Sequence, residues 1–188
     1  MTTLDQTRGT PTQPNGSAEQ PASRFAINWY YCLRCLLAQA ILCPLGLVVL
    51  SLFGAVKNTS GHVSIPLFAT AAILIAPPVE TFIFFYLPYR LFRIFIKNQT
   101  WLWGVSFAVT ILLFICEHHG GGGASPQRNW PMAINVGLIS SVCFFGCFYL
   151  TAKSKRGSPF WTTVACHALY NTGVTAVVLV QAALMNAH

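Results

Sequence analysis

Long apolar runs separated by short polar segments dominate the chain from residue 25 onwards. Each run is close to the length of about 20 residues that an α-helix needs to cross the hydrocarbon core of a bilayer. The five runs cover residues 29–53, 65–87, 101–118, 131–150 and 160–185. They lack the alternation of apolar and polar positions that marks a strand of a membrane barrel. The pattern therefore predicts an all-α fold, a polytopic bundle of about five transmembrane helices.

The first 24 residues differ in kind from the rest of the chain. They are rich in Thr, Gln, Pro, Gly, Ser and Asn and hold few large apolar side chains. Such a segment cannot bury enough apolar surface to offset the entropy of ordering it. We therefore predict a disordered polar tail over residues 1–24 and a transmembrane helical domain over residues 25–188.

The charged residues agree with this interpretation. Asp, Glu, Lys and Arg make up 8% of the 188 residues, whereas soluble domains carry about 25%. The formal net charge is +7, with 11 Lys and Arg against 4 acids. The basic residues sit in short clusters beside apolar runs, without the interleaved stacking aromatics of a nucleic-acid surface. We expect the lipid bilayer as a partner, and no nucleic acid.

The distribution of basic residues between the loops predicts the orientation. With a cytoplasmic N-terminus, the opposite side holds only Lys57 and Arg128. Eight basic residues then lie on the cytoplasmic side: Arg8, Arg24, Arg90, Arg93, Lys97, Lys153, Lys155 and Arg156. This bias follows the positive-inside rule. We expect an integral membrane protein with a cytoplasmic N-terminus, located in a bacterial inner membrane.

Polar residues at membrane depth are costly, and they often mark functional sites. Glu80 and Glu117 are the only acids outside the tail, and His118 and His167 also lie within or at the ends of apolar runs. These residues come from three separate runs, so their side chains can converge in the core of a bundle. Asn171 follows His167 by four residues and therefore shares its helical face.

Three segments resemble the motifs of the CPBP intramembrane proteases, the group of the type II CAAX prenyl proteases and the bacteriocin-processing (Abi) proteins. Those motifs are Glu-Glu-x-x-x-Arg, Phe-x-x-x-His and His-x-x-x-Asn. Residues 78–85 (PVETFIFF) resemble the first, residues 114–118 (FICEH) the second and residues 167–171 (HALYN) the third. The resemblance covers about residues 64–180, and the chain is identified on these motifs as a divergent member.

The resemblance implies an intramembrane endopeptidase that hydrolyses a peptide bond within or at the edge of the membrane. On this analogy Glu80 is the general base that activates a water, and His118 assists it. His167 and Asn171 donate hydrogen bonds to the developing oxyanion. The implied partner is a membrane-associated protein or peptide substrate.

A bound metal ion is an alternative way to activate the water. Glu80, His118 and His167 then form a set of two histidines and one carboxylate of the kind that zinc binds. The His-Glu-x-x-His spacing of many zinc proteases is absent from the chain, and asparagine is a poor zinc ligand. The sequence leaves both forms of the site open.

Two departures from the family pattern leave room for other functions. Thr81 stands where the family has its second Glu, and Phe85 stands where it has Arg. Glu117 replaces the missing carboxylate only if its side chain turns inward. One alternative is therefore a catalytically inactive family member that acts as a membrane binding or scaffold protein. Another is a small transporter that uses the buried Glu and His residues as a relay.

Overall fold

The computed structural model describes residues 25–54, 69–120 and 130–186, and within these ranges the chain is helical with no strand. The elements in chain order are α1 (Trp29–Leu52), η1 (Ala71–Ile75), α3 (Ala76–Glu80), η2 (Thr81–Tyr86), α4 (Leu87–Phe95), α5 (Gln99–Gly120), α6 (Trp130–Ser154) and α7 (Pro159–Asn186). The predicted polar tail, residues 1–24, lies outside the described residues.

Five helical segments of the described chain are long and apolar enough to cross a membrane. They are Trp29–Leu52, Ala71–Phe95, Gln99–His119, Trp130–Ser154 and Pro159–Leu184. The predicted fold class, an all-α bundle with about five spans, is confirmed. The protein is an integral membrane protein by the length and composition of these helices.

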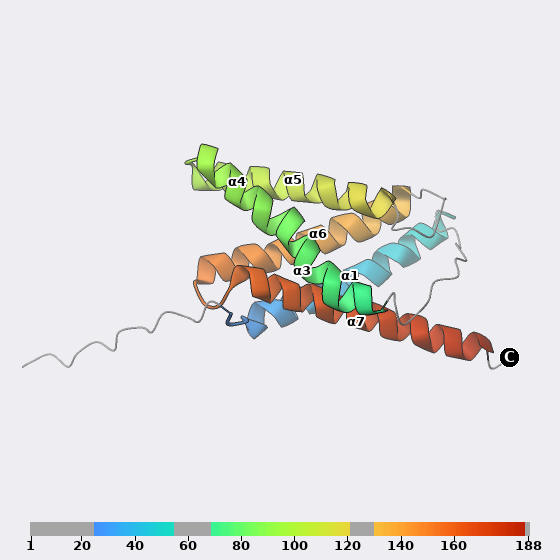
Figure 1. Cartoon of the computed structure of the whole chain (residues 1–188). Helices are drawn as coiled ribbons and strands as arrows, with labels where there is room; N and C mark the ends of the chain where they lie inside the picture. Colours follow the sequence, from blue (N-terminus) through green and yellow to red (C-terminus); the bar gives the residue numbers. More distant parts are fainter. Residues whose placement is uncertain (1–24, 55–68, 121–129, 187–188) are drawn as a thin grey trace, which may run out of the picture.

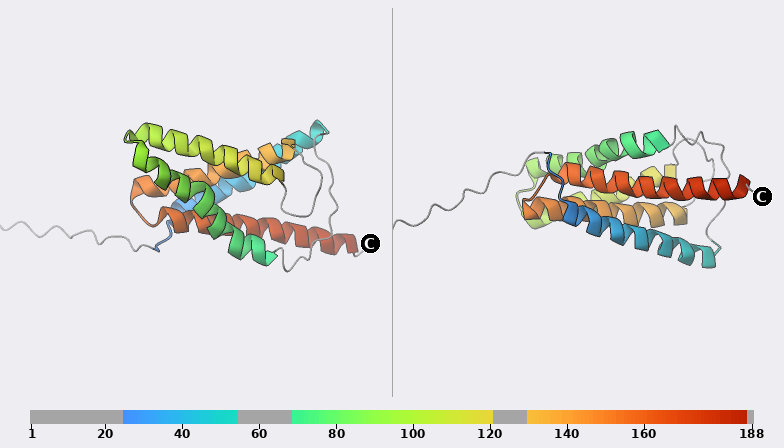
Figure 2. Two further views of the ribbon diagram at one scale, coloured as in Figure 1. Left: turned by 45° about the horizontal axis from the view of Figure 1, so that its top comes forward. Right: turned by 90° about the horizontal axis from the view of Figure 1, so that it is seen from below.

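Helix α6 lies at the centre of the bundle, where it packs against α1, α5 and α7. Half of its apolar stretch is buried, a larger share than in any other span described. Helix α7 lies between α1 and the second span (Figure 2). The core where these helices meet consists of aromatic and thiol side chains: Cys32, Phe85, Phe114, Phe144, Phe145, Cys147, Phe148 and Cys166.

The second span is irregular and crosses the bundle diagonally (Figure 1). Its two π-helical segments, η1 and η2, flank the single α-helical turn that carries Pro77, Pro78 and Glu80. The sequence placed its end near Leu87, but the helix continues to Phe95. Arg90 ends the apolar run, but α4 continues the second span beyond it. The contacts of α4 with α5 hold this extension in place.

Two turns and the start of α1 lie together at one end of the bundle. The Ser158 N–H donates to the Ala26 carbonyl at 2.7 Å, and the Asn28 Nδ2 donates to the Arg156 carbonyl at 2.8 Å. Gly157 between them has a φ of +90°, and a Cβ there would lie 2.8 Å from the Ala26 oxygen. Only glycine fits such a turn. The start of α1 is thereby fixed to the α6–α7 turn, and the α4–α5 turn lies at the same end (Figure 1).

Candidate active site

A cavity of about 650 Å³ lies between the second span, α5 and α7. All four site residues predicted from the sequence line it: Glu80, His118, His167 and Asn171. Glu117 lines the same cavity. The structure therefore brings together two carboxylates, two imidazoles and one carboxamide from three spans. Glu80 and Glu117 are the two acidic residues in the described part of the chain.

The irregular second span sets the position of Glu80. Proline has no N–H, so Pro77 cannot donate to a carbonyl of the preceding turn. The N–H of Ala76 donates to the Ala71 carbonyl in the π-helical pattern. The Ala72 carbonyl therefore accepts a hydrogen bond from neither Ala76 nor Pro77. The Asn171 Nδ2 donates to that carbonyl at 2.7 Å. Asn171 thus ties α7 to the second span, two turns before Glu80.

Glu80 and His167 face each other across the cavity. The Glu80 Oε2 lies 3.7 Å from the His167 Nε2, too far for a direct hydrogen bond. A water about 2.8 Å from each of these atoms would bridge them. The His167 Nδ1 is buried and has no hydrogen-bond partner among the described residues. The ring therefore makes its polar interaction through Nε2, on the side of Glu80.

Aromatic side chains hold the His167 ring. Its centroid lies 4.3 Å from that of Phe144 and 6.3 Å from that of Phe114, and only 4% of the residue is exposed. Phe85 packs edge-to-face on both phenylalanines, at 5.7 Å and 6.2 Å. Phe85 and Thr81 are fully buried. Phe85 and Thr81 therefore form part of a buried wall behind His167.

His118 forms a pair with its neighbour Glu117. The His118 Nδ1 lies 2.8 Å from the Glu117 Oε2 and 2.8 Å from the Phe114 carbonyl oxygen. Two acceptors at one nitrogen indicate that Nδ1 carries a proton, so the neutral ring has its lone pair on Nε2. The sequence left open whether Glu117 turns inward, and here its carboxylate reaches both His118 and the cavity.

The site does not fit a zinc ion as it is arranged here. No group of three or more His, Cys, Asp or Glu side chains in the described ranges has the geometry to hold a metal. The predicted ligand set of Glu80, His118 and His167 is therefore not formed, and no step below depends on a metal.

Small apolar side chains line the remainder of the cavity. On the second span they include Ala71, Ala72 and Ala76, and on α7 Val174 and Thr175. Sequence reasoning missed these residues because an alanine in an apolar run carries no chemical signal. Their recurrence on one side of the second span would have been the available hint. They leave open space beside Glu80.

His119 lies next to the site and is not part of it. Its ring stacks on Trp130 with 3.5 Å between centroids, and it is not among the residues that line the cavity. The contact with Trp130 gives this histidine a packing role between α5 and α6. His119 is therefore a natural control for substitutions of His118 and His167.

Comparison with known proteins identifies no relative: no family model, curated protein or solved structure matches the chain.

Proposed function

We propose that the chain is an intramembrane peptidase of the CPBP type, which hydrolyses a peptide bond of a membrane-associated protein or peptide. The observation that carries the proposal is the 3.7 Å separation of the Glu80 and His167 side chains inside a 650 Å³ cavity. A carboxylate and an imidazole that share a water form the minimal set for general-base hydrolysis.

The first step is attack by water on the scissile carbonyl. The Glu80 carboxylate accepts a proton from the water bridged to His167, and the water oxygen forms a bond to the carbonyl carbon. The carbonyl π electrons move to its oxygen, which becomes an oxyanion. An N–H on the His167 Nε2 stabilises this oxyanion, an interaction that is strongest in a site shielded from solvent.

The second step is departure of the amine. The electrons of the oxyanion re-form the carbonyl as the C–N bond breaks, and the protonated Glu80 donates its proton to the leaving nitrogen, which restores the Glu80 carboxylate. His118 is held by the Glu117 carboxylate and the Phe114 carbonyl. The Glu117–His118 pair supplies a second proton acceptor in the cavity.

Asn171 is best described as a positioning residue. One N–H of its amide is used by the Ala72 carbonyl, so Asn171 holds the second span against α7. Its remaining N–H is the one that can approach an oxyanion. The sequence-based expectation has both His167 and Asn171 as donors to the oxyanion and did not include the bond from Asn171 to Ala72.

A second candidate is a binding protein without catalytic turnover. It is favoured by Phe85, which fills the position of the family's Arg with a fully buried aromatic ring. A protein of this kind would hold a membrane segment in the same cavity without cleaving it. The two candidates share the site and differ only in whether Glu80 takes part in hydrolysis of a peptide bond.

Comparison of new protein N-termini in membranes separates the candidates. Cells that produce the wild-type chain are compared with cells that produce the Glu80→Gln variant, which keeps the shape of the side chain and removes the base. A peptidase generates N-termini that are absent with Glu80→Gln and with His167→Ala. The control is His119→Ala, which alters a histidine outside the cavity.

Two outcomes contradict the peptidase. One is an identical set of N-termini for the wild type and Glu80→Gln, with both proteins inserted at equal levels. The other is an equal loss of cleavage in His119→Ala, which would mean that any disturbance of this region acts through folding. Retention of a bound membrane protein by Glu80→Gln without cleavage by the wild type would favour the binding protein.

We infer that the N-terminus is cytoplasmic and that the membrane is a bacterial inner membrane. The basic residues near the α4–α5 and α6–α7 turns support the orientation, because positive loops remain on the cytoplasmic side. His118 lies near the end of α5 far from these turns. The proposed hydrolysis therefore takes place toward the external side of the bilayer.

A further inference from the structure

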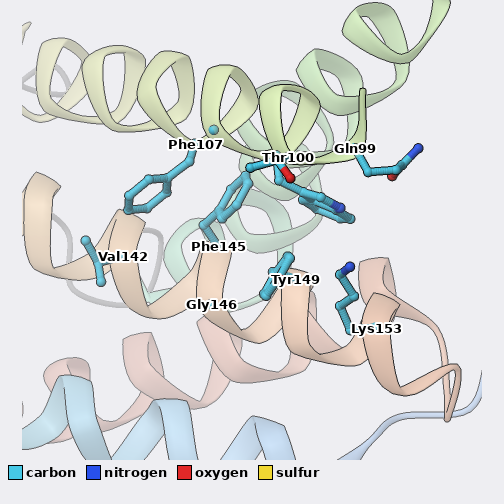
Figure 3. A pocket seen from close by; sticks show the side chains of 10 residues that line it. Gln99, Thr100, Phe107, Val142, Phe145, Gly146, Tyr149 and Lys153 are labelled. Atoms are coloured by element: carbon cyan, nitrogen blue, oxygen red, sulfur yellow. The ribbon is translucent and has the colours of Figure 1, made fainter. Parts of the chain in front are cut away.

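A second cavity lies between α5 and α6, and the proposed peptidase site does not use it. It has a volume of about 450 Å³ and shares no lining residue with the cavity around Glu80. Figure 3 shows it from close by, with Phe107 on α5 and Phe145 on α6. It lies toward the end of the bundle that holds the α4–α5 and α6–α7 turns.

The inner part of this groove is open because two glycines line it. Gly104 on α5 and Gly146 on α6 both border the groove, and a Cβ added to either would meet no atom within 4 Å. Phe107, Val142 and Phe145 supply apolar walls around this space. The result is an elongated apolar slot at membrane depth.

The two helices are too close together for the slot to take a whole helix. At Gly137, further along the same pair, α6 approaches α5 so closely that a Cβ would lie 2.8 Å from the Ile115 Cα. A helix with side chains is about 10 Å wide, and α5 and α6 pack together along their lengths. A single hydrocarbon chain is the shape that a slot of this kind accepts.

The outer end of the groove is polar and positively charged. Gln99, Thr100 and Lys153 line it there, and their polar groups lie at one end in Figure 3. The Lys153 Nζ sits 5.7 Å from the centroid of the Tyr149 ring. The acids in the described part of the chain, Glu80 and Glu117, both line the other cavity. The Lys153 ammonium therefore has no carboxylate partner among the described residues.

The charged end and the apolar slot are close enough to contact one molecule. Lys153 follows Gly146 by seven residues on α6, or about 10 Å along the helix axis. A headgroup at Lys153 and an acyl chain at Gly146 can therefore belong to the same lipid. The order of the groove, a cation at the interface and an open apolar slot below it, is the order of an anionic phospholipid.

We propose that this groove binds one anionic phospholipid of the leaflet that faces the α6–α7 turn. Its phosphate contacts the Lys153 ammonium and the polar groups of Gln99 and Thr100. One acyl chain lies between Gly104 and Gly146. The bound lipid fills the groove between α5 and α6. Of these two helices, α5 carries His118 and α6 lies at the centre of the bundle.

Lipid binding to the purified protein in detergent tests this proposal. Native mass spectrometry is carried out with dioleoyl phosphatidylglycerol and with dioleoyl phosphatidylcholine, which have the same acyl chains and differ in net charge. We expect one phosphatidylglycerol to bind in preference to phosphatidylcholine. Lys153→Gln should weaken the binding of phosphatidylglycerol about fivefold, the usual effect of one basic residue at an anionic membrane surface.

Matched variants separate the groove from general surface charge. Lys155→Gln removes an exposed lysine two residues away that does not line the groove, and it should leave binding unchanged. Gly146→Leu fills the slot and should abolish binding of both lipids. Gly173→Leu, which fills open space on α7 instead, should not.

Three results would overturn the proposal. One is equal binding of the two lipids by the wild type, and another is an equal loss in Lys155→Gln and Lys153→Gln. The third is displacement of phosphatidylglycerol by millimolar inorganic phosphate, which would show a phosphate site without an acyl slot. If Gly146→Leu fails to fold, the comparison of the two lysine variants still decides the question.

Discussion

Prolines within the second span leave backbone carbonyls without helical donors, and side chains of neighbouring helices compensate. Pro88 cannot donate to the Phe84 carbonyl, which accepts a hydrogen bond from the Thr110 hydroxyl of α5 at 2.6 Å. The Asn171 amide serves the Ala72 carbonyl in the same way. An unpaired carbonyl in hydrocarbon costs free energy, so these donors stabilise an irregular helix that a bilayer would otherwise disfavour.

This relation predicts an energetic coupling between Pro77 and Asn171. Asn171→Ala should lower the free energy of unfolding by about 1 kcal/mol, since it removes an interhelical hydrogen bond in a membrane protein. In a Pro77→Ala background the loss should be smaller, because residue 77 regains an N–H for the preceding turn. Thermal unfolding of the four proteins of this double-mutant cycle measures the coupling.

Asn135→Ala is the control for this cycle. The Asn135 Nδ2 donates to the Cys43 carbonyl at 3.4 Å, in another part of the bundle. Its effect should be the same with Pro77 and with Ala at that position. Equal losses from Asn171→Ala in both backgrounds would contradict the assignment of Asn171 as the partner of the proline-freed carbonyl.

The sequence identified the residues of the cavity better than their contacts. Polar groups in apolar runs are conspicuous, and Glu80, His118, His167 and Asn171 were chosen on that basis; all four line one cavity. The bond from Asn171 to Ala72 and the inward turn of Glu117 were not predicted. The first depends on the π-helical turn and Pro77, which free the Ala72 carbonyl, and the second on the side-chain contact of Glu117 with His118; an apolar run reveals neither.

At the scale of the elements, the close approach of α5 and α6 sets the position of one half of the site. Gly137 of α6 is buried against the backbone of Ile115 on α5. Ile115 precedes Glu117 and His118 by two and three residues. A displacement of α5 at this point would therefore move the Glu117–His118 pair relative to Glu80.

Substitution of Gly137 tests this packing. Gly137→Ala should lower the free energy of unfolding by about 1–3 kcal/mol, because the added methyl overlaps the Ile115 backbone. Gly104→Ala on α5 is the matched control, where a Cβ meets nothing within 4 Å, and it should be neutral or slightly stabilising. Similar melting temperatures for the two variants would contradict the close contact.

The elements were predicted well where the apolar runs are regular. The starts of the first, third, fourth and fifth spans lie within two residues of the predicted ones. The end of the second span was missed by eight residues, because Arg90 and Arg93 end the apolar run but not the helix. Tyr89 of α4 stacks on Trp103 of α5 at 4.4 Å, a tertiary contact that no local pattern reveals.

At the scale of the whole molecule, the basic residues and two of the turns lie at one end of the bundle. The α4–α5 and α6–α7 turns and the start of α1 meet there (Figures 1 and 2). Lys97, Lys155 and Arg156 lie in these turns, and Arg93 and Lys153 lie in the last turn of the helix before each. With five spans, the two ends of the described chain lie on opposite sides of the membrane.

Reporter fusions test the orientation of the chain. Alkaline phosphatase, which is active only outside the cytoplasm, should be active when fused after Asn186 and inactive when fused after Lys155 in the α6–α7 turn. A fluorescent protein that folds in the cytoplasm should give the opposite result at both sites. An active phosphatase after Lys155 would contradict the cytoplasmic assignment of the positively charged end.

The central claim is that Glu80 and His167 act on one water molecule, and a kinetic double-mutant cycle tests it most directly. Cleavage of a substrate found from the N-terminal comparison is measured in liposomes for the wild type, Glu80→Gln, His167→Ala, the double variant and His119→Ala. Each single variant should lose about 10²–10⁴ in rate, and the double variant should lose little more, since groups that act as a unit are not additive. A wild-type rate in either single variant, or the product of the two losses in the double variant, would contradict a shared water.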